Sequence, residues 1–217
     1  WLFFFLLNRF FFTLFFIDEI STASFTEIYT ILPKSIPLDI SFISYLLVPV
    51  VVLIWLNSFL KNKQFINKII YSIVSFFLLI SGLINGGEVA LYSEWNTKLN
   101  FTALAHFKNP SEVFSTASTG HIFTTFLFLL ISVVFIRIYK NKVHIILPIQ
   151  SSVGIIKKVF ILPFALGILL LGIRGGLHPI PINLSDAYFS NTIILNDIAV
   201  NPNWNVMQSI LKSKSNF

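Results

Sequence analysis

Four ionisable side chains lie inside or directly beside apolar runs of this sequence, where charged groups are costly. Arg9 interrupts the first run, Glu88 lies near the end of the third, and Arg174 and His178 follow the fifth. An ionisable side chain in such a run is a candidate for an ion pair, a proton relay or a ligand contact. Arginine also suits phosphate, because its planar guanidinium donates two hydrogen bonds at once.

Arg9 has two interpretations. An arginine at the centre of a membrane-crossing helix costs about 2.5–3.5 kcal/mol on insertion scales, and we then expect it to pair inside the helical bundle. The sequence starts at Trp1 rather than Met and is already apolar there, so we expect the N-terminus to be incomplete. In a longer first helix, Arg9 would instead lie near the inner membrane surface.

The third apolar run carries a small-residue pattern followed by an acid. Gly82 and Gly86 are four residues apart, a spacing that lets two helices pack closely. Glu88 comes next and has three open interpretations: it binds a cation or pairs with one, it accepts a proton, or it rests at the outer membrane interface.

The usual catalytic and metal-binding motifs are missing from the sequence. It has no cysteine, which excludes disulfides and thiolate chemistry. It has no Walker loop and no GxGxxG or GxSxG motif. None of its histidines shows HExxH spacing, so we expect no metal site and no catalytic residue made from this chain alone; the histidines are His106, His121, His144 and His178.

The elements that position these side chains belong to a membrane protein. Hydrophobic residues make up 55% of the 217 residues and charged residues 11%, compared with about 25% in soluble domains. Mean hydropathy is +0.82. A net charge of +6 would indicate nucleic-acid binding in a soluble protein, but here we expect membrane lipids as partners and no nucleic acid.

Five apolar runs predict an all-α integral membrane protein with about five transmembrane helices. A crossing helix needs about 20 residues, with about 17 as the short limit. The runs are continuous rather than alternating, which argues against a membrane β-barrel. They cover 1–17, about 40–60, about 69–92, about 122–139 and about 159–173.

The basic residues predict the orientation. Loops 61–68 and 137–158 hold eight Lys and Arg and no acid, whereas loops 18–39 and 85–121 hold three Lys and seven acids. The positive-inside rule places the two basic loops in the cytoplasm. We therefore predict a multi-pass protein of the bacterial cytoplasmic membrane with its N-terminus inside and its C-terminus outside.

Two polar segments are expected on the outer surface. In loop 93–121, Pro110 and Ser111 predict a short surface helix. The last part of the chain is too polar to cross a membrane and too short to form its own core, and "NDIAVNPNWNVMQSI" predicts two short helices with a proline break between them. We predict a transmembrane bundle over 1–173 and an extracytoplasmic connector over 174–217.

Three stretches carry a resemblance that covers essentially the whole chain. They are "SEWNTKLNFTALAHFKNPSEVFSTAS" at 93–118, "RGGLHPIPINLSDAYFS" at 174–190 and "ILNDIAVNPNWNVMQSI" at 194–210. In this order, on five predicted spans, they resemble the membrane portion of bacterial sulfatase-superfamily proteins related to lipoteichoic acid synthase and phosphoglycerol transferases. The similarity is strongest to the Bacteroidetes-type version.

The resemblance implies five transmembrane helices followed by a large extracytoplasmic domain of the alkaline-phosphatase type. That domain would bind a divalent metal (manganese, magnesium or zinc) and use a Thr or Ser nucleophile. It would transfer a phosphoglycerol-type headgroup from a lipid to a glycan or lipid acceptor. None of its catalytic residues or metal ligands falls within these 217 residues, so in this interpretation the chain is an anchor and a lipid-substrate platform.

Five side chains expected near the outer interface are candidates for contact with the headgroup of an anionic glycerophospholipid or glycolipid: Arg174, His178, Glu88, Glu94 and Trp95. In the alternative interpretation, Arg174 only anchors the fifth helix at the interface. A different class of function also remains, a stand-alone membrane scaffold or transporter subunit without enzymatic activity. Transporters typically show inverted repeats or broken spans, and neither is evident in the sequence.

Overall fold

The computed structural model describes residues 1–59, 63–106, 118–143 and 154–215. These residues form helices and turns with no strand among them, which agrees with the expected all-α class. Three helical stretches are long and apolar enough to cross a membrane, namely Phe25–Asn57, Gln64–Trp95 and Thr119–Lys142.

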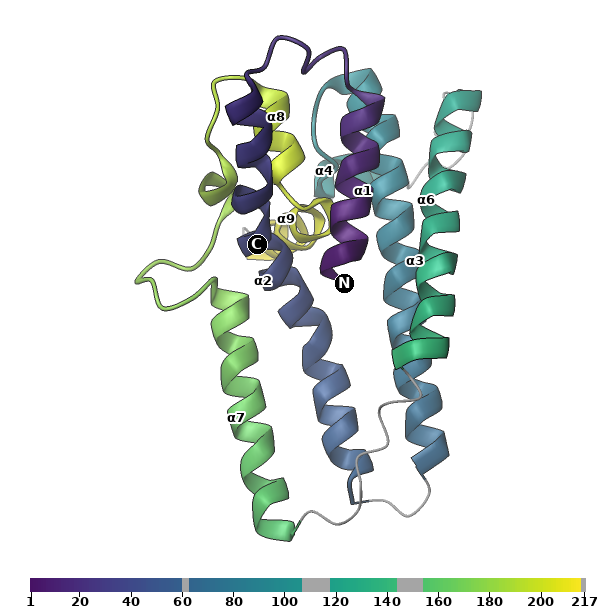
Figure 1. Cartoon of the computed structure of the whole chain (residues 1–217), viewed down its shortest axis with the longest axis vertical. Helices are drawn as coiled ribbons and strands as arrows, with labels where there is room; N and C mark the ends of the chain where they lie inside the picture. Colours follow the sequence, from purple (N-terminus) through teal and green to yellow (C-terminus); the bar gives the residue numbers. More distant parts are fainter. Residues whose placement is uncertain (60–62, 107–117, 144–153, 216–217) are drawn as a thin grey trace.

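The helices follow the chain from purple to yellow in Figure 1. They are α1 (Leu2–Phe15), α2 (Phe25–Asn57), α3 (Lys63–Trp95), α4 (Phe101–His106), α6 (Thr119–Ile138), α7 (Ile155–Arg174), α8 (Ile193–Ala199) and α9 (Pro202–Ser215). A π-helical turn follows α6 and a 3-10 turn precedes α8. The last two helices match the pair predicted around a proline break, whereas the surface helix predicted at Pro110 and Ser111 lies outside the described residues.

Helix α2 starts much earlier than the second apolar run, so the loop expected over 18–39 is wrong beyond Ser24. The Ser24 hydroxyl accepts a hydrogen bond from the backbone N–H of Glu27 (3.3 Å), and the Glu27 carboxylate accepts one from the backbone N–H of Ser24 (3.1 Å). This capping box fixes the start of the helix. Three prolines lie inside this helix, at Pro33, Pro37 and Pro49.

Helices α3 and α6 lie side by side along most of their length (Figure 1). Gly82 and Gly86 are at their contact. A Cβ on Gly86 would lie 2.6 Å from the Cα of Thr125, and one on Gly82 would collide with the side chain of Ser132. Small residues at this spacing therefore allow the two backbones to approach closely.

The molecule has two levels in Figure 1. In the lower level, α7 lies along the lower half of α2; in the upper level, α1, α4, α8 and α9 gather around the upper halves of α2 and α3, and α6 runs beside α3 from the upper level into the lower one. Leu195, Ile198 and Trp204 are buried in the same hydrophobic cluster as Phe12 and Tyr92. Helices α8 and α9 therefore share the core of the bundle.

Candidate functional site

Arg9 points from α1 toward the turn between α8 and α9, which we call the α8–α9 junction. Its guanidinium makes two parallel hydrogen bonds to the Asp39 carboxylate of α2, of 2.9 and 3.0 Å. Its Nε donates to the backbone oxygen of Ile198 at 2.9 Å. Arg9 is 8% exposed and Asp39 fully buried. Bidentate geometry of this kind gives both strength and a fixed orientation.

Asn201 connects this ion pair to the start of α9. Its side-chain amide donates to Asp39 at 2.7 Å, and its Oδ1 accepts the backbone N–H groups of Asn203 (2.9 Å) and Trp204 (3.1 Å). The first N–H groups of a helix have no partner within the helix, so Asn201 satisfies two of them. The Trp204 indole then donates to the Ser41 hydroxyl of α2 at 3.1 Å.

A second buried ion pair holds the junction from the side of α3. Lys98 pairs with Glu88, and the other Glu88 oxygen accepts the backbone N–H of Leu99 at 2.9 Å. Lys98 also donates to the backbone oxygen of Asp197 at 2.9 Å, and the Tyr92 hydroxyl donates to the Asp197 carboxylate at 3.0 Å. Glu88 is fully buried, so its carboxylate is occupied by Lys98 and Leu99.

The two cationic side chains of the junction both bind the C-terminal end of α8. Arg9 and Lys98 each donate to one of its last carbonyl groups, those of Ile198 and Asp197. Carbonyls in the last turn of a helix lack partners within the helix and carry the negative end of its dipole, so cations stabilise them. Residues far away in the sequence thereby fix the position of α8.

The junction contains more acids than bases. Asp39, Glu88 and Asp197 face Arg9 and Lys98. Asp197 lies outside the spanning helices; burial raises the pKa of its carboxyl, while the Lys98 ammonium and the hydrogen bond from Tyr92 oppose that rise. A charge excess in a buried site favours protonation of one acid.

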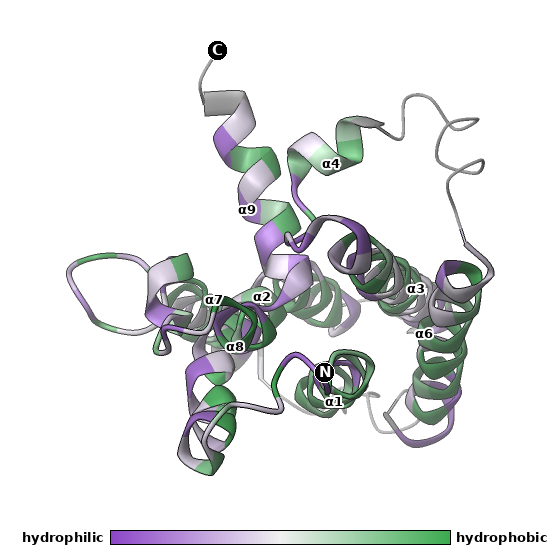
Figure 2. Cartoon of the chain, turned by 90° about the horizontal axis from the view of Figure 1, so that it is seen from above, coloured by the Kyte–Doolittle hydropathy of each residue, from purple (hydrophilic) through white to green (hydrophobic). Residues whose placement is uncertain are grey.

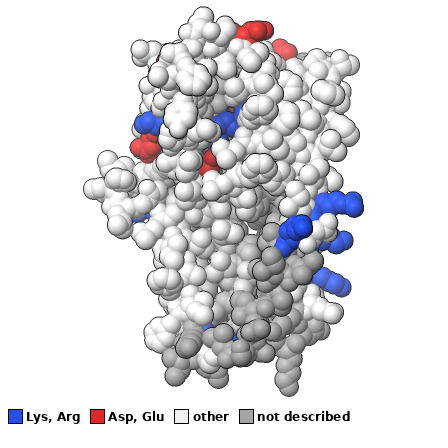
Figure 3. Space-filling model, viewed as in Figure 1, with Lys and Arg blue, Asp and Glu red and all other residues white. Residues whose placement is uncertain are grey.

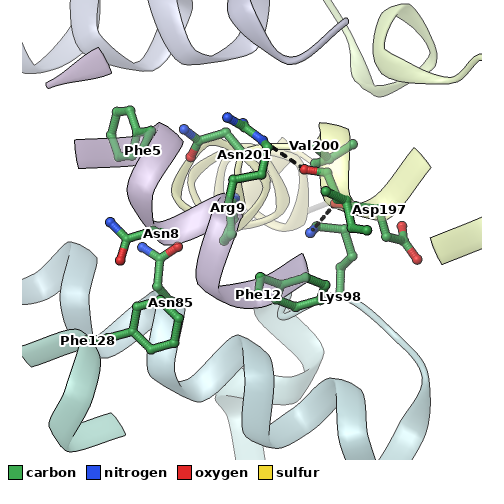
Figure 4. Close-up of a pocket in the computed structure, with 12 residues that line it drawn as sticks. Phe5, Asn8, Arg9, Phe12, Asn85, Lys98, Phe128, Asp197, Val200 and Asn201 are labelled. Carbon is green, nitrogen blue, oxygen red and sulfur yellow. Dashed lines mark hydrogen bonds between the residues drawn. The ribbon is translucent and has the colours of Figure 1, made fainter. Parts of the chain in front are cut away.

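Figure 4 shows a small cavity beside the junction, bordered by Asn8, Asn85 and Phe128 as well as by Arg9 and Lys98. Within the described part of the chain, Asn8 Oδ1 has no hydrogen-bond partner. The cavity holds about 20 Å³, close to the roughly 10–15 Å³ that one water molecule needs. Ligand pockets measure about 300–1,000 Å³, so this cavity has room for a water molecule but is far smaller than such a pocket.

Arg174 ends α7 and bonds only within its own neighbourhood. Its guanidinium donates to the backbone oxygens of His178 (3.2 and 3.3 Å) and Pro179 (2.7 Å). Both Arg174 and His178 are exposed. Two of the five residues predicted to contact a headgroup are therefore close together and accessible, and Arg174 also closes the loop that carries His178.

The other predicted headgroup residues lie elsewhere. The Glu94 carboxylate is 3.6 Å from the His121 ring at the ends of α3 and α6, and Trp95 is exposed there. Figure 2 places α7 on the opposite side of the bundle from α3 and α6. The five side chains predicted together thus occupy three places: the loop after α7, the buried junction, and the end of α3.

Most residues of the junction were not predicted from the sequence. Asp39 was placed in a loop, and Lys98, Asp197 and Asn201 were given no role. One signal in the sequence could have indicated the pair. Asp39 is an acid among apolar residues with no basic residue beside it, so it is a plausible partner for the isolated Arg9. The other partners come from segments whose approach no local pattern indicates.

The described residues contain no cluster of three or more His, Asp or Glu side chains that could hold a metal ion. Comparison with known proteins finds no matching family model, no similar characterised protein and no similar solved structure. Function must therefore be argued from the residues and their arrangement.

Proposed function

We propose that this chain is the membrane portion of a sulfatase-superfamily enzyme related to lipoteichoic acid synthase and phosphoglycerol transferases. It would anchor a metal-dependent domain at the outer face of a bacterial cytoplasmic membrane and present a lipid headgroup to it. The sequence support is the resemblance of 93–118, 174–190 and 194–210, and the structural support is the way these stretches meet.

The observation that carries the proposal is the assembly of the three stretches at one end of the bundle. The Asn205 side chain donates to the backbone oxygen of Leu99 at 2.8 Å, and the backbone N–H of Phe101 donates to the Ser209 hydroxyl at 2.8 Å. The backbone N–H groups of Phe189 and Ser190 donate to the side-chain oxygen of Asn196 at 2.8 and 3.0 Å. Segments about 100 residues apart thus form one platform, as an anchor for an outer domain requires.

We further propose five spans, with the upper ends of the helices on the outer side of the membrane. Helix α7 has 20 residues, enough to cross a bilayer, whereas the 14 residues of α1 are fewer than the roughly 17 required. In Figure 3 the visible acidic side chains lie in the upper half together with some Lys and Arg, and a further group of Lys and Arg side chains projects from the right flank from about mid-height downward. This distribution fits basic loops inside.

Within this proposal, headgroup contact belongs to Arg174 and His178. Both side chains are exposed at the upper end of α7, and a guanidinium and an imidazole can both donate to phosphate oxygens. Glu88 is paired with Lys98 inside the bundle. Glu94 and Trp95 lie at the end of α3, on the side of the bundle opposite α7. These three side chains would therefore not contact the headgroup that Arg174 and His178 bind.

Two experiments test the anchor role. The DNA after the codon for Phe217 should continue into a domain of the alkaline-phosphatase type, and an unrelated gene there would instead favour a stand-alone scaffold or transporter subunit. An alkaline phosphatase reporter fused after Phe217 should be active and a green fluorescent protein fused there dark, because only the former works outside the cytoplasmic membrane. The reverse pattern would reject the orientation.

The headgroup contact is tested in the full-length enzyme with vesicles containing phosphatidylglycerol. The variant His178→Ala removes the imidazole but keeps the backbone oxygen that Arg174 uses, so the loop stays closed. We expect a higher KM for the lipid in this variant and in Arg174→Lys, which keeps the charge but loses the bidentate fork. Unchanged KM values in both variants would remove these residues from substrate binding.

A further inference from the structure

The loop after α7 presents apolar side chains outward. Leu177 is 87% exposed and Ile180 is 74% exposed. Between Gly175 and Ile182 the only ionisable residue is His178. In Figure 1 this loop projects sideways from the bundle at the height where α7 ends. We call it the 175–182 loop.

Backbone hydrogen bonds within the loop and to the end of α7 fix its conformation. The backbone N–H of Ile182 donates to the Arg174 oxygen at 2.9 Å, and the N–H of Gly176 donates to the Leu171 oxygen at 2.9 Å. Gly175 and Gly176 have φ of 81° and 114°, values that strongly favour glycine. The Arg174 guanidinium adds three bonds across the loop, so its apolar tip is held in place before any partner arrives.

The apolar tip continues the outer face of α7. Phe164 is 73% exposed, Ile168 54% and Leu171 44%, and these residues lead along the helix toward the loop. Single exposed apolar residues are common on protein surfaces, but a closed loop with two large ones, adjoining an apolar helix face, is typical of an interaction site.

We propose that the 175–182 loop is an interfacial anchor that inserts Leu177 and Ile180 into the boundary between headgroups and acyl chains of the outer leaflet. The occupant is lipid because the loop is continuous with the apolar face of α7, which contacts lipid in the five-span arrangement proposed above, and the inference rests on that arrangement. Apolar side chains at such a boundary lie about 5–10 Å deep. The loop thereby fixes the height of α7, and of Arg174, relative to the headgroups.

The absence of cysteine from the sequence makes a clean test available. Leu177→Cys and Ile180→Cys, each carrying a nitroxide label, are placed in nanodiscs of phosphatidylethanolamine and phosphatidylglycerol. Collision rates are measured with oxygen, which concentrates in lipid, and with a nickel chelate, which stays in water. Phe164→Cys on α7 provides the lipid control and Thr22→Cys, in the exposed turn before α2, the comparison site away from the loop.

We expect both loop labels to collide with oxygen several-fold more than with the chelate, relative to Thr22→Cys, and to approach the Phe164→Cys ratio. Collision ratios equal to those of Thr22→Cys would overturn the proposal, because the tip would be in water. Protection from both reagents would also overturn it, because protein would then cover the tip. The result does not depend on any enzymatic activity, so it can fail while the proposed function stands.

Discussion

The α8–α9 junction and the 175–182 loop each contain an arginine that donates to backbone oxygens, and they use it in opposite ways. Arg9 is buried and reaches partners 30 and 189 residues away in the sequence. Arg174 is exposed and reaches only residues four and five positions ahead. The first arginine connects distant helices, and the second shapes a local turn.

The difference shows what burial does to a charge. A buried charge must be paired and hydrogen-bonded, because leaving it unpaired costs several kcal/mol. Arg9 therefore makes the position of α8 dependent on α1 and α2. An exposed charge keeps water as an alternative partner. Arg174 can therefore shape the loop, while removal of its side chain changes the stability of the fold only slightly.

Removing the Asp39 carboxylate from the Arg9–Asp39 ion pair should have the largest effect on stability. Asp39→Ala leaves the Arg9 guanidinium buried and unpaired, so we expect the free energy of unfolding to fall by about 3–5 kcal/mol. Unfolding of the purified protein in mixed micelles, followed by circular dichroism, measures this loss.

The double variant Arg9→Met with Asp39→Leu is the matched control, because apolar residues of similar volume often replace a buried pair at little cost. It should recover most of the stability lost in Asp39→Ala. A double variant as unstable as the single one would show that the bonds to Ile198 and Asn201, rather than the unpaired charge, dominate.

Two helical glycines differ in the same way, since one lies at a helix–helix contact and the other faces open space. Gly86 faces α6, and a Cβ there would lie 2.6 Å from the Cα of Thr125, whereas a Cβ on Gly167 of α7 meets nothing within 4 Å. Overpacking at Gly86→Ala should cost about 1–3 kcal/mol, while Gly167→Ala should be neutral or stabilise the helix by up to about 1 kcal/mol. Thermal melts of both variants, in the same detergent, test this contrast, and equal costs would refute it.

Local patterns in the sequence predicted the helices well and their long-range partners poorly. The apolar runs, the glycine spacing and the proline break each depend on residues close together in the chain, and helices are found at each of them. The start of α2 lies outside the second apolar run and was not predicted, although Ser24 and Glu27 carry the capping-box spacing that marks it. Orientation and the number of spans stay predictions.

The site was harder to predict because its members come from separate elements. Arg9 meets Asp39 only if α2 extends upward as a helix, and Lys98 meets Asp197 only if α8 folds back onto the bundle. Net charge and motif searches do not contain that information. The headgroup residues were grouped by expected depth alone, whereas depth does not say on which side of the bundle a residue lies.

Titration of the junction should give a smaller, pH-dependent effect. Because the pKa of Asp197 is raised in the folded protein, its folded state binds a proton more tightly than the unfolded state does. The stability that this proton provides is fully present below the unfolded pKa, about 3.9, and is lost as pH rises through the folded pKa. Asp197→Asn keeps an acceptor for Tyr92 without titrating, so its stability relative to wild type should rise across that window in melts at stepped pH. A constant difference would show that Asp197 does not titrate differently on folding.

The smallest effect is expected at the other arginine. Arg174→Lys keeps a positive charge but cannot donate to His178 and Pro179 through a planar fork. Because the side chain is exposed, the free energy of unfolding should change by less than about 1 kcal/mol. A nitroxide at Leu177→Cys should nevertheless give a sharper spectrum in this variant, because a loop with fewer closing bonds moves more freely. If Arg174→Lys destabilised the protein as much as Asp39→Ala does, the loop would be part of the folded core, and the distinction between a buried arginine that joins helices and an exposed one that shapes a turn would not hold.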